Sequence, residues 1–332
     1  MSLTIYDSQT ARQTILLRRP PDETGLPPAA QERITALFGE PLSAEQAVAR
    51  IIADVRRRGD EALRKWTQKL DGADLSDGLE VPPAECQQAL QNLPDDLRAA
   101  LETAAARIRD FHRRQPALSW IEQNQDGTLG QLIRPIERVG VYVPGGSAPL
   151  PSSVLMSVIP ARVAGVRRVV VCTPPGRHGQ VNPVILAACA LAGVDAVYRV
   201  GGAQAIAAMA FGTPGLPAVD KIVGAGGLFV TLAKRQVFGV VGIEGLAGPT
   251  ETLVIADESA NPRRVAADLL AQAEHDPLAT ALLLTPSRPL AEAVAAQVDE
   301  LLDAEADERL ERAEIIRASL AARGGAVVTR DL

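Results

Sequence analysis

The sequence is poor in aromatic residues and cysteine, and it contains no long apolar run. Aromatic residues make up 3% of its 332 residues, so its cores must be built mainly from Ala, Val, Leu and Ile. The three cysteines, Cys86, Cys172 and Cys189, form no CxxC pair, which predicts buried or incidental thiols in a reducing compartment. No run is long enough to span a bilayer, and the N-terminus lacks the apolar core of a signal peptide. We therefore expect a cytoplasmic protein with no membrane partner.

The sequence also lacks an excess of positive charge. Its formal net charge is -6 and its pI is about 5.3, which argues against a nucleic-acid partner held by phosphate contacts. The basic cluster at 56–58 is followed closely by acidic residues, as on a solvated helix face. The hydrophobic share of 47% and the charged share of 22% are typical of a globular protein long enough for two domains.

The first third of the chain is predicted to be mostly helical. Residues 1–40 are polar and broken by proline pairs, so we expect an arm with short helices at most. Ser43 and Gln46 have the spacing of a capping box and start a helix with apolar residues at helical spacing. Further helical patterns cover about 60–70 and 95–114.

After residue 132 the pattern changes to strands that alternate with helices. The predicted strands are 139–144, 166–175, 196–202 and 221–227, and the helices between and after them are 154–164, 182–192, 203–210 and 228–238. A second series has strands at 251–257, 279–286 and 325–332 and helices at 262–274 and 290–311. This alternation predicts an α/β fold with parallel sheets, in which ligands bind at the carboxyl ends of strands.

Three glycine-rich loops follow predicted strands, at 142–149, 200–208 and 223–230. Each could bring backbone amides close to a phosphate, although none is a GxGxxG motif and no Walker lysine is present. Any one of them alone is more typical of a tight turn. Three such loops in one sheet favour a shared ligand cleft, with a nucleotide as the natural ligand.

Histidine is scarce, with only three copies. His112 and His178 lie in polar segments and are predicted to be solvated. His275 follows a helix before a proline, and Gln272 precedes it at i,i+3 spacing. By spacing alone, a cationic side chain at a helix end is the better interpretation, because catalytic zinc sites have three or more protein ligands. No Ser/His/Asp arrangement is apparent.

Five blocks taken together resemble histidinol dehydrogenases: VGVYVPGGSAPLPSSVLM, VGGAQAIAAMAFGT, VDKIVGAGGLFVTLAKRQV, AGPTETLVIAD and LLAQAEHDP. The resemblance runs from about residue 40 to the last residue. It implies NAD-dependent oxidation of L-histidinol to L-histidine, one zinc ion and a homodimer. It also implies two incomplete Rossmann-like domains of the aldehyde-dehydrogenase type. These would be 41–138 plus 250–332, and 139–249 on the NAD side, preceded by the arm at 1–40.

On the cofactor side, the resemblance implies that Tyr142 and Gln204 contact NAD. The family's third loop usually reads GPGN, with the asparagine on NAD, whereas this chain has GAGG at 224–227. Gly227 therefore stands where one polar contact is expected, and we predict weakened NAD binding.

On the substrate side, the resemblance assigns the hydroxyl of Thr250 to substrate, and Gln272 and His275 to zinc and substrate. The family's Glu–His acid/base pair and its remaining zinc ligands, an aspartate and a histidine, would lie beyond Leu332. We therefore expect a truncated histidinol dehydrogenase with weak zinc binding. Two alternatives stay open: an inactive paralogue that keeps the fold and at most weak nucleotide binding, and a family relative that oxidises another small alcohol.

Overall fold

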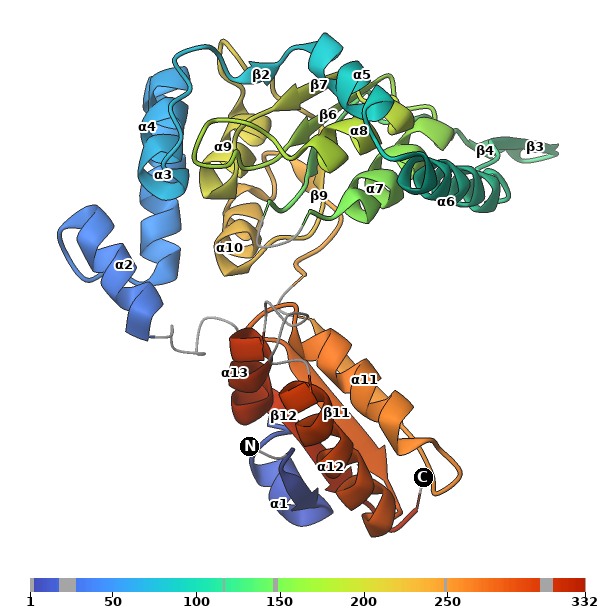
Figure 1. Cartoon of the computed structure of the whole chain (residues 1–332). Coiled ribbons are helices and arrows are strands. Elements are labelled where there is room, and N and C mark those ends of the chain that lie inside the picture. The colour runs from blue at the N-terminus through green and yellow to red at the C-terminus, as the bar shows by residue number, and fades with distance from the viewer. Residues whose placement is uncertain are drawn as a thin grey trace. The chain divides into compact units, whose positions relative to one another are not determined.

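The chain forms two compact units (Figure 1). The computed structural model describes residues 3–17, 28–115, 117–145, 149–247, 250–304 and 313–331. The larger unit is Gly25–Leu246, and the smaller one combines Met1–Thr24 with Ala247–Leu332. This division differs from the predicted domains, which joined 41–138 to 250–332. Within the described residues, no helix combines the length and the hydropathy that a membrane span needs.

A six-stranded sheet forms the centre of the larger unit. Its strand order is β2 (Glu80–Val81), β7 (Ala196–Tyr198), β6 (Arg168–Cys172), β5 (Arg138–Tyr142), β8 (Lys221–Val223) and β9 (Gly242–Ile243). All neighbours are parallel except β2 and β7. Because β6 and β7 lie on one side of β5, and β8 and β9 on the other, the strand order reverses at β5. In doubly wound sheets, ligands bind at the carboxyl ends of the strands beside such a reversal.

Helices cover both faces of this sheet. One core is shared by α3 (Ala44–Arg58), α4 (Asp60–Asp71), α9 (Gly202–Phe211) and α10 (Leu228–Val237). The other is shared by α5 (Pro83–Gln91), α6 (Asp95–Arg113), α7 (Pro151–Val163) and α8 (Pro183–Ala192). Alternate strand residues enter opposite cores: Val141 packs with the second group, and Tyr142 with the first. Four helices before residue 138 thus complete this sheet's cores, which is why the larger unit starts so early.

Two elements lie at the margins of the larger unit. Helix α2 (Pro28–Phe38) contacts α3, and the expected capping box at the start of α3 is present. Strands β3 (Trp120–Asn124) and β4 (Gly127–Gln131) pair as an antiparallel hairpin whose residues are all exposed.

The smaller unit is built on a four-stranded parallel sheet. Its order is β1 (Ile5–Asp7), β12 (Gly324–Val328), β11 (Thr280–Thr285) and β10 (Glu251–Ile255). Helices α11 (Pro262–Ala273), α12 (Arg288–Ala304) and α13 (Ala313–Arg323) share one core with β11 and β12, and α1 (Ser8–Gln13) contacts β1 and β12. On β10, Leu253 and Ile255 point away from that core and are 50% and 61% exposed.

The predicted α/β class with parallel sheets is confirmed, and the observed strands are shorter than predicted because the glycines and prolines at their ends belong to loops. The predicted arm contains a strand, β1, that the sequence did not reveal. Several predicted segments extend outside the described residues: 146–148 of the first glycine loop, 248–249 of the AGPT block, 305–312 after α12, and Leu332. All three cysteines are free and buried, as predicted, and burial raises the pKa of the Cys86 thiol to about 11.

Candidate cofactor site

Tyr142 joins the three glycine-rich loops at the carboxyl edge of the six-stranded sheet. It is the last residue of β5, and its hydroxyl accepts a hydrogen bond of 3.2 Å from the backbone N–H of Gly202, the first residue of α9 after the loop that follows β7. Gly224, in the loop after β8, lies so close to the Tyr142 carbonyl oxygen that a Cβ at this position would collide with it. Gly201 in turn packs against Pro174, which follows β6. The loops that the sequence suggested as one ligand cleft therefore do meet.

The phenol of Tyr142 acts as a neutral hydrogen-bonding group. The residue is 5% exposed, and burial raises its pKa to about 12. The hydrogen bond from Gly202 lowers the pKa, but by less than burial raises it. Because the hydroxyl keeps its proton at neutral pH, it can donate one hydrogen bond in addition to the one it accepts. It is therefore suited to orienting a ligand, and not to removing a proton from one.

Gln204 lies next to this contact, near the start of α9. Its side chain is fully buried, and neither the amide oxygen nor the amide nitrogen has a hydrogen-bond partner among the described residues. A Cβ on Gly202 would lie 2.7 Å from the Gln204 Oε1, so the amide is folded back toward the first residue of α9. An unpartnered buried amide destabilises the fold. The same amide fits a polar cofactor with both a donor and an acceptor, provided that the ligand displaces the atoms that now cover it.

The third loop, Gly224–Gly227, ends at the start of α10. Gly227 is the N-cap residue of that helix, and no side chain caps it. Its φ is -64°, and a Cβ built on it would meet nothing within 4 Å. The position therefore has neither a conformational nor a steric need for glycine. An asparagine would fit there and would supply the N-cap acceptor that the helix lacks.

The other three residues implied by the resemblance belong to the smaller unit. Thr250 is exposed and directly precedes β10, and its carbonyl accepts a hydrogen bond from Thr280. Gln272, on the last turn of α11, accepts a 2.6 Å hydrogen bond at Oε1 from the Thr252 hydroxyl, which the sequence did not suggest. Its Nε2 is buried without a partner among the described residues. His275 is exposed beyond the helix end, which agrees with a solvated position.

The described part of the chain holds no cluster of three or more His, Cys, Asp or Glu side chains that could bind a metal. Of the implied ligand pair, the Gln272 amide is oriented by Thr252, while His275 is open to solvent. An amide oxygen and an imidazole suit zinc chemically, but two ligands bind it only weakly. The other two histidines lie in the larger unit, where His112 contacts Gln115 at 2.7 Å and His178 is exposed in the loop after β6.

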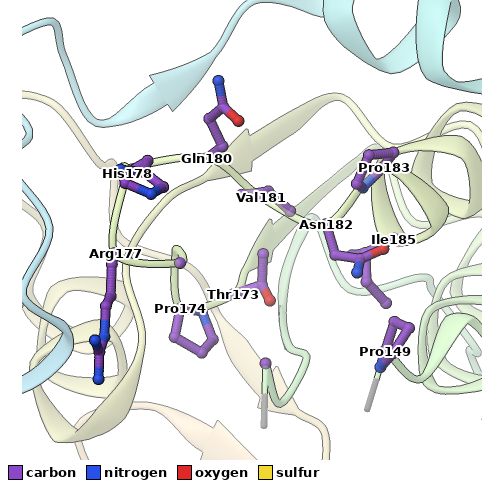
Figure 2. A pocket seen from close by; sticks show the side chains of 12 residues that line it. Pro149, Thr173, Pro174, Arg177, His178, Gln180, Val181, Asn182, Pro183 and Ile185 are labelled. Atoms are coloured by element: carbon purple, nitrogen blue, oxygen red, sulfur yellow. The ribbon is translucent and has the colours of Figure 1, made fainter. Parts of the chain in front are cut away.

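A cleft of about 380 Å³ opens between the first glycine loop and the segment that follows β6 (Figure 2). Thr173 and Pro174 from the end of β6, Pro149 from the loop after β5, and Asn182 from the start of α8 surround it. The Asn182 side chain also caps α8 by accepting a hydrogen bond from the backbone N–H of Val184. The sequence did not identify this cleft. The only available signal was the Thr-Pro-Pro end of the strand pattern at 166–175.

Comparison with known proteins gives one consistent family. The family model for histidinol dehydrogenase matches residues 40–332. The histidinol dehydrogenase of Deinococcus radiodurans is 54% identical over 295 residues, covering 89% of this chain and 67% of the relative. The one from Parasynechococcus marenigrum is 53% identical, with coverages of 85% and 63%. The chain thus spans roughly two thirds of the length of the curated relatives it matches.

A solved structure agrees with this result. The crystal structure of histidinol dehydrogenase from Elizabethkingia anophelis superposes with a TM-score of 0.84 at 34% sequence identity. The match covers 100% of this chain and 71% of that one. The likeness therefore extends over both compact units.

Proposed function

Because the chain belongs to the histidinol dehydrogenase family, we propose that it takes part in the oxidation of L-histidinol to L-histidine with NAD as the oxidant. The alcohol loses a hydride to NAD and a proton to give the aldehyde. The aldehyde then adds water, and its hydrate loses a hydride to a second NAD and a proton to give the acid. The proposed binding of NAD is supported by the unpartnered Gln204 amide, which lies beside the loops that Tyr142 joins.

Residue roles follow from this proposal. Tyr142 and Gln204 hydrogen-bond the cofactor, and Gly227, in the third loop, lies beside it without a polar side-chain contact. Thr250, Gln272 and His275 serve the substrate, and the last two also bind zinc. When bound, zinc supplies a Lewis acid that orients the imidazole and the amine of histidinol. Gln272 is held ready for that role by the hydrogen bond from Thr252 to its Oε1.

We also propose that the chain pairs as a homodimer in the cytoplasm. The support is its membership of the family, since the resemblance implies a dimer. Light scattering of the purified chain tests the pairing. A monodisperse monomer at micromolar concentration would refute it.

A second candidate is an inactive relative that keeps the fold and binds nucleotide weakly. Gly227 favours it, because a side chain would fit in the open space at that position and none is present. The two candidates differ in turnover. Only the enzyme forms NADH in a histidinol-dependent manner when zinc is supplied.

The experiment combines binding, stability and turnover. NAD affinity is measured by calorimetry for the wild type, for Gln204→Leu and for the control Gln236→Leu, whose amide donates to the Glu45 carbonyl on α3. We expect Gln204→Leu to raise the NAD Kd by about tenfold, equivalent to about 1.4 kcal/mol. It should also increase stability by about 1 to 3 kcal/mol, because an unpaired buried amide is replaced by an apolar group.

The outcomes separate the alternatives. No NAD binding by the wild type overturns the cofactor role. NAD binding without histidinol-dependent NADH formation supports the inactive relative. Lower stability of Gln204→Leu with an unchanged Kd would show that Gln204 serves only the fold.

A further inference from the structure

An ion pair between buried Lys234 and solvent-exposed Glu244 lies beside the third glycine loop. Lys234, on α10, is 2% exposed, and its ammonium group donates to Glu244 Oε2 at 2.6 Å and to the Gly224 carbonyl at 3.1 Å. Glu244 follows β9, and its Oε1 accepts a 2.7 Å hydrogen bond from the backbone N–H of Gly224. The two side chains therefore bond both backbone polar groups of Gly224 and close a ring around this one residue.

The opposite side of the same residue is fixed by Tyr142. Gly224 has a φ of +116°, a conformation that side chains rarely adopt, and a Cβ would collide with the Tyr142 carbonyl oxygen. Gly224 is thus held between the end of β5 and the ion pair. Its position determines where the next three residues, up to the first turn of α10, can lie.

Burying a lysine is costly unless its charge is paired and its protons are bonded. The next residue shows the ordinary alternative. Arg235 is exposed by about a third and pairs at 2.9 Å with Glu45 on α3, away from the loop. An ion pair needed only to attach α10 could use that exposed position. Lys234 is buried instead, and it and Glu244 place their bonds on the loop backbone.

We propose that Lys234 and Glu244 are positioning residues for the cofactor, which fix the Gly224–Gly227 loop in the conformation that receives it. The inference rests on the proposed use of NAD. Neither side chain needs to touch the cofactor, because both act through the backbone of Gly224. Loss of the pair releases the loop, so binding must order it again and becomes weaker.

The test compares NAD Kd by calorimetry with the unfolding temperature in four proteins: wild type, Lys234→Met, the double variant Lys234→Met/Glu244→Gln, and Arg235→Met as the matched control. We expect at least about a tenfold higher Kd for both Lys234 variants, and less than about a twofold change for the control. The double variant removes both charges and so avoids an unpaired carboxylate. A purely structural role lowers the unfolding temperature and leaves the Kd of the folded protein unchanged.

Each outcome either supports or overturns the positioning role of Lys234 and Glu244. Folded Lys234 variants with wild-type Kd overturn the inference alone, because the wild type still binds NAD. A wild type that binds no NAD overturns both the inference and the proposed function. If neither Lys234 variant folds, Glu244→Asp decides. It keeps both charges but withdraws the carboxylate from Gly224, and a Kd raised at least about fivefold supports the inference, whereas an unchanged Kd refutes it.

Discussion

Asp71 is expected to destabilise the larger unit at neutral pH, and replacing it with asparagine should therefore stabilise the protein. The residue ends α4 and is half-buried, and its Oδ2 has no hydrogen-bond partner among the described residues. Burial raises the pKa of its carboxyl group to about 6, against the opposing attraction of the Arg33 guanidinium. The charge of Asp71 also contributes to the raised pKa of Tyr142, so the carboxylate acts close to the candidate site.

The size and sign of the effect follow from linkage. Between the ordinary pKa of 3.8 and the folded value of about 6, the folded state binds more protons than the unfolded state. Stability therefore falls as pH rises through this window, and the full cost is present above it. The difference sets a ceiling of about 3 kcal/mol. Because Asp71 is partly exposed, solvent screening reduces the expected cost to about 1 to 2 kcal/mol.

Urea unfolding at several pH values measures this cost. The emission of Trp66, on the same helix, reports unfolding of the larger unit when the second tryptophan, on the exposed hairpin, is replaced in a Trp120→Phe background. At pH 7.5, Asp71→Asn should be more stable than the background by about 1 to 2 kcal/mol. Near pH 4 the difference should disappear, because the carboxyl group is then neutral in the folded state.

Asp77→Asn is the control, since it removes an exposed carboxylate six residues further along the chain. It should change the unfolding free energy by less than about 0.5 kcal/mol at either pH. An Asp71→Asn protein that is less stable than the background at pH 7.5 would refute the reasoning. A difference that does not depend on pH would refute it as well.

Four further results are expected. Gly224→Ala should destabilise the protein by about 3 kcal/mol or more in urea unfolding, through backbone strain and collision with strand β5, whereas Gly227→Ala should cost less than about 1 kcal/mol. Gly227→Asn should lower the NAD Kd several-fold in calorimetry, and an unchanged Kd would argue against a cofactor role for this position. Asp54→Ala should cost about 3 to 5 kcal/mol, since Asp54 is buried among charged partners, against less than about 0.5 kcal/mol for exposed Glu40→Ala. Hydrogen bonds, first from Arg58, lower the Asp54 pKa, so its contribution should fade on acidification. After dialysis against chelator, elemental analysis should find less than one zinc per chain, because the two implied ligands near the end of α11 hold it weakly, and stoichiometric retention would contradict this.

The parallel sheets could be predicted from the sequence because their strands carry strong local signals. Val139 and Val141 belong to a β-branched run that ends in proline and glycine, and such runs recur between helical segments. Strands β1 and β2 have only three and two residues, and their partners, β12 and β7, lie far away in sequence. No local pattern identifies such a strand, because its stability comes from a pairing that only the fold supplies.

The extent of the larger unit could not be predicted for a related reason. Amphipathic periodicity shows that α3 has an apolar face, but it does not show which sheet that face covers. Val48, Ile51 and Val55 on α3 pack with α9 and α10 against the sheet that contains Tyr142. The resemblance identifies Tyr142 and Gln204, whereas the sequence gives no signal for a role of Lys234. In the sequence it stands next to Arg235 at a helix end, where a solvated cation is the usual expectation.

Buried polar atoms without a hydrogen-bond partner occur at two of the residues that the resemblance implies for the site. Within the described residues, seven buried side-chain nitrogen or oxygen atoms have no hydrogen-bond partner, and three of them belong to Gln204 and Gln272. Arg98 and Arg199 contribute one atom each, but their guanidinium groups bond backbone carbonyls through other nitrogens. Two described residues have a whole side-chain polar group that is buried and unpartnered: Thr67, with one hydroxyl, and Gln204, with an amide that can both donate and accept. A leucine would fill the space of Gln204 at lower cost to stability, and the proposed hydrogen bonds to a cofactor would offset the cost of the amide.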